Sequence, residues 1–173
     1  MTPLAQKLYD ANKQRYETAA DPLRSHGPDH HYRVYQHALK LAHALGVTYD
    51  DDILAADVLA EIDFPQAKTE AVLYAIAHHG SDAKYKNEDE PVEVTLLRDA
   101  DKLDVFGPIG VARIIMVRTL KGDTLQEIVD DFYIHGHLER KWSSITSDVA
   151  KEIAKADYEY SKAFFAQLSQ TLS

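Results

Sequence analysis

The sequence has 173 residues and a mass of 19.5 kDa, which predicts one domain over residues 1–173. Its 19 Lys and Arg against 28 Asp and Glu give a formal net charge of -9, which argues against duplex nucleic acid as a partner because that partner needs a basic surface. The absence of cysteine excludes disulfides and thiolate metal sites, and no apolar run approaches the ~20 residues of a membrane span. We therefore expect a cytoplasmic protein without membrane contact, in which histidines and carboxylates are the strong metal ligands.

Helical periodicity predicts an all-α fold, because no stretch of alternating β-branched residues is long enough to form a strand. Asp29 can cap the second helix, and Gly46 is expected to end it. The polar residues 81–90 predict a surface loop. In chain order, the expected helices cover residues 3–24, 30–45, 50–62, 67–79, 91–103, 109–120, 124–134 and 147–172.

Histidines and acidic residues gather at three helix ends. Helix geometry limits which of them can bind one ion, since His30 and His37 are ~10 Å apart along a helix axis. Asp99 and Asp101 flank an apolar position, so only one of the two is expected to line a pocket. Taken singly, each group is typical of a capping or surface residue. The groups are His26, His30 and His31; His78 and His79; and the block 99–104 (DADKLD).

Four segments carry longer strings, which are residues 26–34 (HGPDHHYRV), 70–79 (EAVLYAIAHH), 99–113 (DADKLDVFGPIGVAR) and 137–142 (HLERKW). In this order they resemble the motifs HG-x-D-H-x-x-R-V, EAVxxAIxxH, DADRLDAxGAIGIAR and HFxxKL of the HD superfamily of metal-dependent phosphohydrolases. Residues 146–165 are similar to the terminal helix of the same subgroup. The resemblance extends along most of the chain.

The resemblance implies a compact HD-domain-like helical bundle around one metal site. It assigns His30, His79 and Asp101 as ligands of a divalent ion, which could be Mn, Fe, Co, Ni or Mg, and places Asp104 close to them. The implied chemistry is attack by a metal-activated water on a phosphoester or phosphoanhydride, with a nucleotide or another small phosphate as substrate. The residues that the resemblance assigns to phosphate contact are Arg33, Lys102 and Lys141.

The His–Asp doublet that names the superfamily is absent from this chain. In one alignment, residues 59–62 (LAEI) stand in place of LHDI, so that Ala60 replaces the histidine and Glu61 the aspartate. In the other, which we favour, residues 57–65 (DVLAEIDFP) correspond to a segment that follows the doublet in longer relatives, and the doublet is deleted. In either case Glu61 or Asp63 can supply a further oxygen, and Glu61 joins Asp101 as an expected catalytic carboxylate.

Two classes of function therefore stay open. The first is a metal-dependent phosphohydrolase that is weakened by loss of the doublet, with Asp101, Asp104 and Glu61 as its catalytic acids. The second is a catalytically inactive HD-like domain that binds a nucleotide or a protein partner. A further departure is Asp157, which stands where the subgroup's last helix usually carries arginine. The sequence leaves the substrate and the oligomeric state open.

Overall fold

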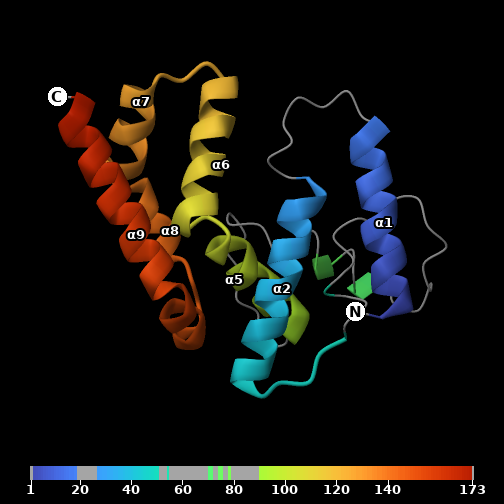
Figure 1. The fold of residues 1–173 in the computed structure, drawn as a ribbon. Coiled ribbons are helices and arrows are strands. Elements are labelled where there is room, and N and C mark those ends of the chain that lie inside the picture. The colour runs from blue at the N-terminus through green and yellow to red at the C-terminus, as the bar shows by residue number, and fades with distance from the viewer. Residues whose placement is uncertain are drawn as a thin grey trace. The chain divides into compact units, whose positions relative to one another are not determined.

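The chain folds into helices, as seen in a computed structural model (Figure 1) that describes residues 2–18, 27–50, 54, 70–71, 74–75, 78 and 90–172. Within these ranges no residue forms a strand. The chain divides into two compact units, Met1–Asp101 and Lys102–Ser173. One domain over residues 1–173 stays a prediction. None of the helices in the described ranges has both the length and the apolar character that a bilayer crossing requires.

In the first unit, helix α1 (Pro3–Thr18) packs against helix α2 (Pro28–Leu45). The rings of Tyr9 on α1 and Tyr32 on α2 meet edge to face, with their centroids 5.5 Å apart. The apolar stripe that helical spacing predicts for α2 is buried at Val34, Ala38, Leu41 and Ala42, whereas Leu45 at the end of the helix is exposed. The helix ends at Gly46, whose φ of 64° is in the left-handed region that favours glycine.

The start of α2 differs from the prediction. The helix begins at Pro28 rather than at residue 30, and Gly27 is its N-cap. Asp29 therefore lies inside the first turn and does not cap the helix, so that expectation was wrong. The physical reason is that the ring of Pro28 fixes φ at a helical value and needs no backbone donor in the first turn. Asp29 still places negative charge at the positive end of the helix dipole.

Helix α5 (Val92–Leu103) confirms the helix predicted over residues 91–103. It is buried on several sides, with Val94 and Ala100 fully enclosed. Its first turn is tied to the preceding chain, because Glu93 accepts a 2.8 Å hydrogen bond from the backbone amide of Asp50. Residues 54, 70–71, 74–75 and 78 are helical, in keeping with two further predicted helices. The remainder of those two helices, and residues 81–89 of the predicted loop, lie outside the described residues.

The second unit contains helices α6 (Gly107–Leu120), α7 (Leu125–Val129), α8 (His137–Ser143) and α9 (Asp148–Leu172), and the π-helix η2 (Asp130–Ile134). The long helix α9 packs against all the others in this unit, as can be followed in Figure 1. Phe165 of α9 is fully buried and stacks on Phe132 of η2 at 5.7 Å between ring centroids. This packing gives the second unit its core.

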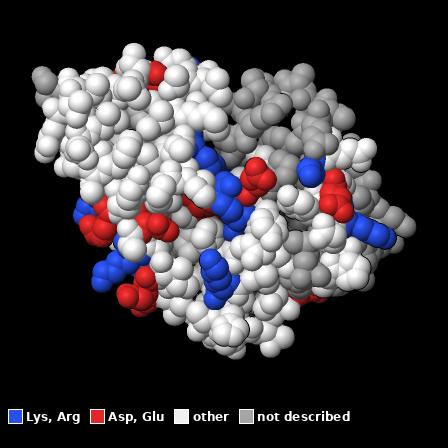
Figure 2. All heavy atoms as spheres, in the orientation of Figure 1, with Lys and Arg blue, Asp and Glu red and all other residues white. Residues whose placement is uncertain are grey.

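Three features of the second unit differ from the sequence prediction. The helix expected from residue 109 begins at Gly107. The single helix expected over residues 124–134 is instead α7, capped by Thr124, followed by the π-helical turn η2. The segment after the His135–His137 turn forms α8, which was not predicted. On the face drawn in Figure 2, acidic and basic side chains are interspersed on the described surface.

Candidate metal centre

Helices α2 and α5 bring His30 and Asp101 together within the first unit. His30 Nε2 lies 3.4 Å from Asp101 Oδ1. His30 precedes Val34 by one turn and so continues the buried stripe of α2, which leaves its side chain only 6% exposed. Asp101 shares a face of α5 with Val94, and its side chain is 31% exposed. The pair thus has one buried member and one that solvent can reach.

The separation of the two side chains fits a pair of ligands on one ion. Nitrogen and carboxylate oxygen ligands lie about 2.0–2.2 Å from a transition-metal ion, which places adjacent ligand atoms about 2.8–3.6 Å apart for angles between 90° and 109° at the ion. The observed 3.4 Å lies within this range, and it is longer than a usual direct hydrogen bond of about 2.7–3.2 Å. An imidazole with a carboxylate is a donor set that suits Mn, Fe, Co or Ni.

The other predicted ligands are not described. His79, Glu61 and Asp63 all lie outside the described residues. Among the residues that the structure does describe, no group of three or more His, Asp or Glu could hold a metal ion. The assignment of His79 therefore stays a prediction.

The two aspartates around Ala100 occupy different environments. Asp99 is 1% exposed, whereas Asp101 lies beside His30. The sequence predicts that only one of the two lines a pocket; Asp101 is the one that approaches His30, and its role in a site stays a prediction. His78, the other residue of the histidine doublet, is engaged within its own helical turn, where Nδ1 lies 2.7 Å from the carbonyl oxygen of Tyr74 and the two rings stack at 4.0 Å.

Two further predicted residues lie in buried polar contacts of the second unit. The carboxylate of Asp104 pairs with the guanidinium of Arg113, which also donates a 3.2 Å hydrogen bond to the Asp104 carbonyl. The ammonium of Lys102 donates to the carbonyl of Ser144 at the C-terminal end of α8. Burial of these charges is compensated by such partners. The catalytic role expected for Asp104 and the phosphate contact expected for Lys102 stay predictions.

The remaining predicted phosphate ligands lie on different helices. Arg33 follows His30 by one turn on α2 and is half-buried in the first unit. Lys141 lies on α8 in the second unit and is also half-buried. Of the predicted site residues, the structure thus brings together His30 and Asp101, with Arg33 on the helix of His30.

The departure at Asp157 has a structural explanation within the second unit. The exposed carboxylate lies against Gly107 at the start of α6, so close that a Cβ atom at residue 107 would be 2.6 Å from Oδ1. The Gly107 amide donates to the hydroxyl of Ser161 at 2.9 Å, and that hydroxyl donates to the Asp157 carbonyl. A carboxylate is favourable near a helix N-terminus, where an arginine would not be.

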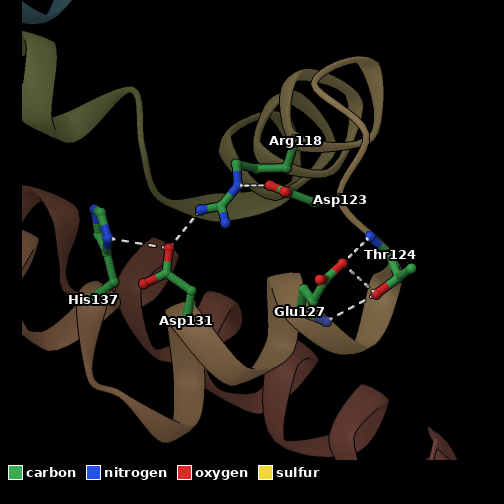
Figure 3. Close-up of polar contacts among 6 residues, drawn as sticks. All are labelled: Arg118, Asp123, Thr124, Glu127, Asp131 and His137. Atoms are coloured by element: carbon green, nitrogen blue, oxygen red, sulfur yellow. Dashed lines mark hydrogen bonds and ion pairs between the residues drawn. The ribbon is translucent and has the colours of Figure 1, made fainter.

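A separate cluster in the second unit joins α6, η2 and α8 (Figure 3). Arg118 bonds to both Asp123 and Asp131, and Asp131 Oδ2 lies 3.5 Å from His137 Nδ1. Burial would raise the pKa of Asp131, but its bonds with Arg118 and the neighbouring His137 outweigh this and lower it. Burial lowers the pKa of His137, with Lys141 and Arg140 adding to the effect and Asp131 opposing it.

The structure also reveals a polar residue that the sequence analysis did not select. Arg98 on α5 is 4% exposed and bonds to the carboxylate of Glu90 and to the carbonyl of His78. The sequence offered one signal for its burial. Arg98 lies three residues before Asp101, inside a helix with an otherwise buried face. A charged residue at such a position needs a specific partner.

Comparison with known proteins places these features in context. No family model matches the sequence. A curated relative, YpgQ of Bacillus subtilis, is 30% identical over 91 residues, which make up 51% of this chain and 44% of that protein. The match therefore spans less than half the length of this relative.

Solved structures match almost the whole chain. A protein from Lactobacillus plantarum has a TM-score of 0.76 at 20% identity, over 99% of this chain and 98% of that one. B. subtilis YpgQ, solved in complex with ADP, has a TM-score of 0.72 at 18% identity, over 97% and 94% of the two chains. An HD-superfamily hydrolase from Bacillus thuringiensis has a TM-score of 0.69 at 20% identity, over 97% and 96%. The predicted all-α, HD-like fold is thereby confirmed.

Proposed function

We propose that this protein is a metal-dependent phosphohydrolase that acts on a nucleotide or another small phosphate ester or anhydride. The observation that carries the proposal is the 3.4 Å approach of His30 Nε2 to Asp101 Oδ1. These residues are the first and last ligands of the metal-binding pattern that the motifs resemble. They come from two helices far apart in the sequence, so their meeting is a property of the fold.

In the proposed centre, His30 and Asp101 hold the divalent ion, and His79 together with Glu61 or Asp63 completes the ligand set. Such an ion supplies Lewis acidity toward phosphate oxygens and lowers the pKa of water. The burial of His30 holds its imidazole in one orientation, which favours ion binding at a fixed place. The partial exposure of Asp101 leaves this side of the pair open to a substrate.

A phosphate substrate is a reasonable ligand for an acidic protein only where local positive charge exists. The formal net charge of -9 opposes the approach of an anion, so the divalent ion and nearby cationic side chains must offset it. Arg33, one turn from His30 on α2, is the proposed cation in the first unit. A guanidinium suits this role because it binds phosphate through paired hydrogen bonds.

The comparisons support a nucleotide as the substrate class. YpgQ was solved with ADP, and the B. thuringiensis structure is that of an HD-superfamily hydrolase. Both share the fold of this chain. We extend nucleotide binding and hydrolysis to this protein as part of the proposal.

The absent His–Asp dipeptide favours a second candidate function. If the remaining ligands do not hold an ion, the same scaffold binds a nucleotide or a protein partner without turnover. The two candidates differ in what a chelator does. The enzyme loses activity when the metal is removed, whereas the binding domain retains its nucleotide-induced rise in melting temperature.

A calorimetric titration with Mn²⁺ tests the proposed function most directly. We expect stoichiometric binding that is lost in Asp101→Ala, together with Mn²⁺-dependent release of phosphate or pyrophosphate from a panel of nucleotides. Asp10→Ala is the matched control, because it removes the same charge from an exposed position on α1 in the same unit. Mn²⁺ binding that Asp101→Ala retains, or no binding by the wild type, would contradict the proposed metal centre.

A further inference from the structure

A histidine ring forms part of the contact between η2 and α8 in the second unit. His137 is the first residue of α8, and its imidazole stacks on the ring of Phe132 of η2, with centroids 4.6 Å apart and an angle of 19° between the planes. Phe132 is buried and stacks in turn on Phe165 in the core of the unit. The side chain of His137 is 30% exposed. A group that titrates near neutral pH therefore packs against the core at this joint.

The carboxylate beside His137 is already bonded to another cation. Oδ2 of Asp131 lies 3.5 Å from His137 Nδ1, which is longer than a usual hydrogen bond of about 2.7–3.2 Å. The same oxygen accepts a hydrogen bond from Arg118, which also donates to Asp123 (Figure 3). A proton on His137 would therefore add a second cation to a carboxylate that Arg118 already neutralises.

The surroundings of His137 favour its neutral form. Burial lowers the pKa of the imidazole, the Asp131 carboxylate opposes this effect, and the charges of Lys141 and Arg140 lower the pKa further. His137 also lies at the positive end of the α8 dipole, where the backbone amides of the first turn disfavour a cation. Several independent features thus disfavour a proton on the stacked ring.

The other acidic groups on the elements that pack against α8 have partners of their own. These elements are η2 and α9. The acidic groups and their partners are Asp130, which accepts from Gln126 at 2.9 Å; Glu139, which accepts from the Tyr158 hydroxyl and lies 3.8 Å from Lys162 Nζ; and Glu159, which lies 3.9 Å from the same ammonium. Asp131 is therefore the acidic group that acts on His137.

We propose that the joint between η2 and α8 opens when His137 takes up a proton, so that the second unit contains an acid-sensitive hinge. In the closed form the neutral ring stacks on Phe132, and in the open form the protonated ring is in water, where its charge is hydrated. The rest of α8 stays attached, because Leu138 is buried and the Ser144 carbonyl accepts from Lys102. This inference does not depend on the proposed function.

Proton linkage gives the direction and the limit of the effect. Above the usual histidine pKa near 6.5 the ring is neutral in both forms, and opening does not depend on pH. Below it, the open form binds a proton more readily than the closed form, so its population rises as the pH falls. A single proton limits this rise to about 10-fold at one pH unit below the usual pKa.

Hydrogen exchange of single backbone amides, measured by NMR on the whole chain, tests the hinge. The reporters are the amides of His135 and Arg140, which donate to the carbonyls of Asp130 and Gly136 at 2.7 and 3.0 Å. From about pH 7.5 to 5.5, after correction for the intrinsic pH dependence of exchange, we expect their protection factors to fall severalfold and by no more than about 10-fold. Amides in the middle of α9 should keep their protection.

Two variants assign the effect to one ring. His137→Phe keeps an aromatic ring beside Phe132 but cannot take up a proton, so the fall in protection should be absent. His135→Gln removes the neighbouring exposed histidine and should behave as the wild type. If His137→Phe does not fold, His137→Gln serves in its place.

Three results would overturn the proposal. The first is an unchanged protection at His135 and Arg140 in the wild type, and the second is an equal fall in the His137 variant. The third is a fall of the same size throughout α9, because the whole unit would then unfold rather than the joint alone. Loss of the effect in His135→Gln would also overturn it, since the proton would then belong to His135.

Discussion

The backbone of Gly107 lies directly against the carboxylate of Asp157, where helix α6 begins beside helix α9. A Cβ atom at residue 107 would approach Asp157 Oδ1 to 2.6 Å, and the φ of Gly107 is 76°. Only glycine satisfies both the close approach and the left-handed backbone. The contact fixes the start of α6 on α9, together with the hydrogen bond from the Gly107 amide to Ser161.

The first prediction concerns this contact. Gly107→Ala should lower the free energy of unfolding by about 2–3 kcal/mol, because it adds a steric conflict to the cost of a left-handed residue. Gly46→Ala is the matched control, since Gly46 has a similar φ of 64° but nothing within 4 Å of the added Cβ. Urea denaturation of both variants separates the two costs. Equal losses in the two variants would show that the approach of Asp157 is unimportant.

The buried pair of Asp104 and Arg113 should be strongly coupled. Their side chains are 3% and 17% exposed, so removing one partner leaves a charge in a poorly solvated place. Each of Asp104→Leu and Arg113→Met should cost about 3 kcal/mol, and the double variant should cost less than their sum by more than 1 kcal/mol.

The ion pair of Arg118 and Asp123 in the same unit provides a matched double-mutant cycle. The side chains of Arg118 and Asp123 are 26% and 30% exposed, so the coupling energy of this pair should be below about 1 kcal/mol. Denaturation of both sets of single and double variants at neutral pH provides the comparison. A coupling at Asp104–Arg113 no larger than that at Arg118–Asp123 would argue against a stabilising role for the buried pair.

The third prediction concerns the pH dependence of stability at His137. Burial lowers the pKa of this imidazole in the folded protein below its usual value near 6.5. The unfolded chain therefore binds a proton more readily, and the contribution of neutral His137 is fully present above the unfolded pKa. It is lost as the pH falls from 6.5 through the folded pKa.

Thermal melts between pH 8 and 5 measure this contribution. His137→Gln should flatten part of the decline in melting temperature below pH 6.5, and His135→Gln provides a matched variant at an exposed histidine nearby. The lowered pKa of Asp131 has the same sign but acts below about pH 4, because carboxyl groups titrate there. A steeper decline in His137→Gln than in the wild type would contradict the assignment.

Several elements of the fold could be predicted because local chemistry determines them. Gly46 ends α2, and an apolar stripe at helical spacing marks that helix. The π-helix η2 could not be predicted, because its register depends on tertiary packing. Phe132 of η2 stacks on Phe165 of α9 and on His137, and the extra residue in the turn is compatible with those contacts.

The candidate site divides in the same way. The ligand roles proposed for His30 and Asp101 rest on motifs, since no helical spacing relates two residues so far apart in the chain. The contact of Arg98 with Glu90 and the His78 carbonyl was not predicted. It joins three segments that are separate in the sequence, and nothing in the sequence distinguishes Arg98 from a surface arginine. Arg98 needs these specific partners because it is buried in the folded unit, and the sequence does not show that burial.

Metal removal provides the last prediction. If His30 and Asp101 hold a divalent ion, a ligand at 100 times its dissociation constant stabilises the folded state by about 2.7 kcal/mol. For a protein of this size, that corresponds to a rise of about 5–10 °C in melting temperature when Mn²⁺ is added to the chelated protein. The rise should vanish in His30→Gln, because the variant lacks one of the two ligand atoms that meet at 3.4 Å. His43→Gln, an exposed position on the same helix, should retain it. A rise that His30→Gln keeps would place the ion elsewhere in the protein and remove the main support for the proposed centre.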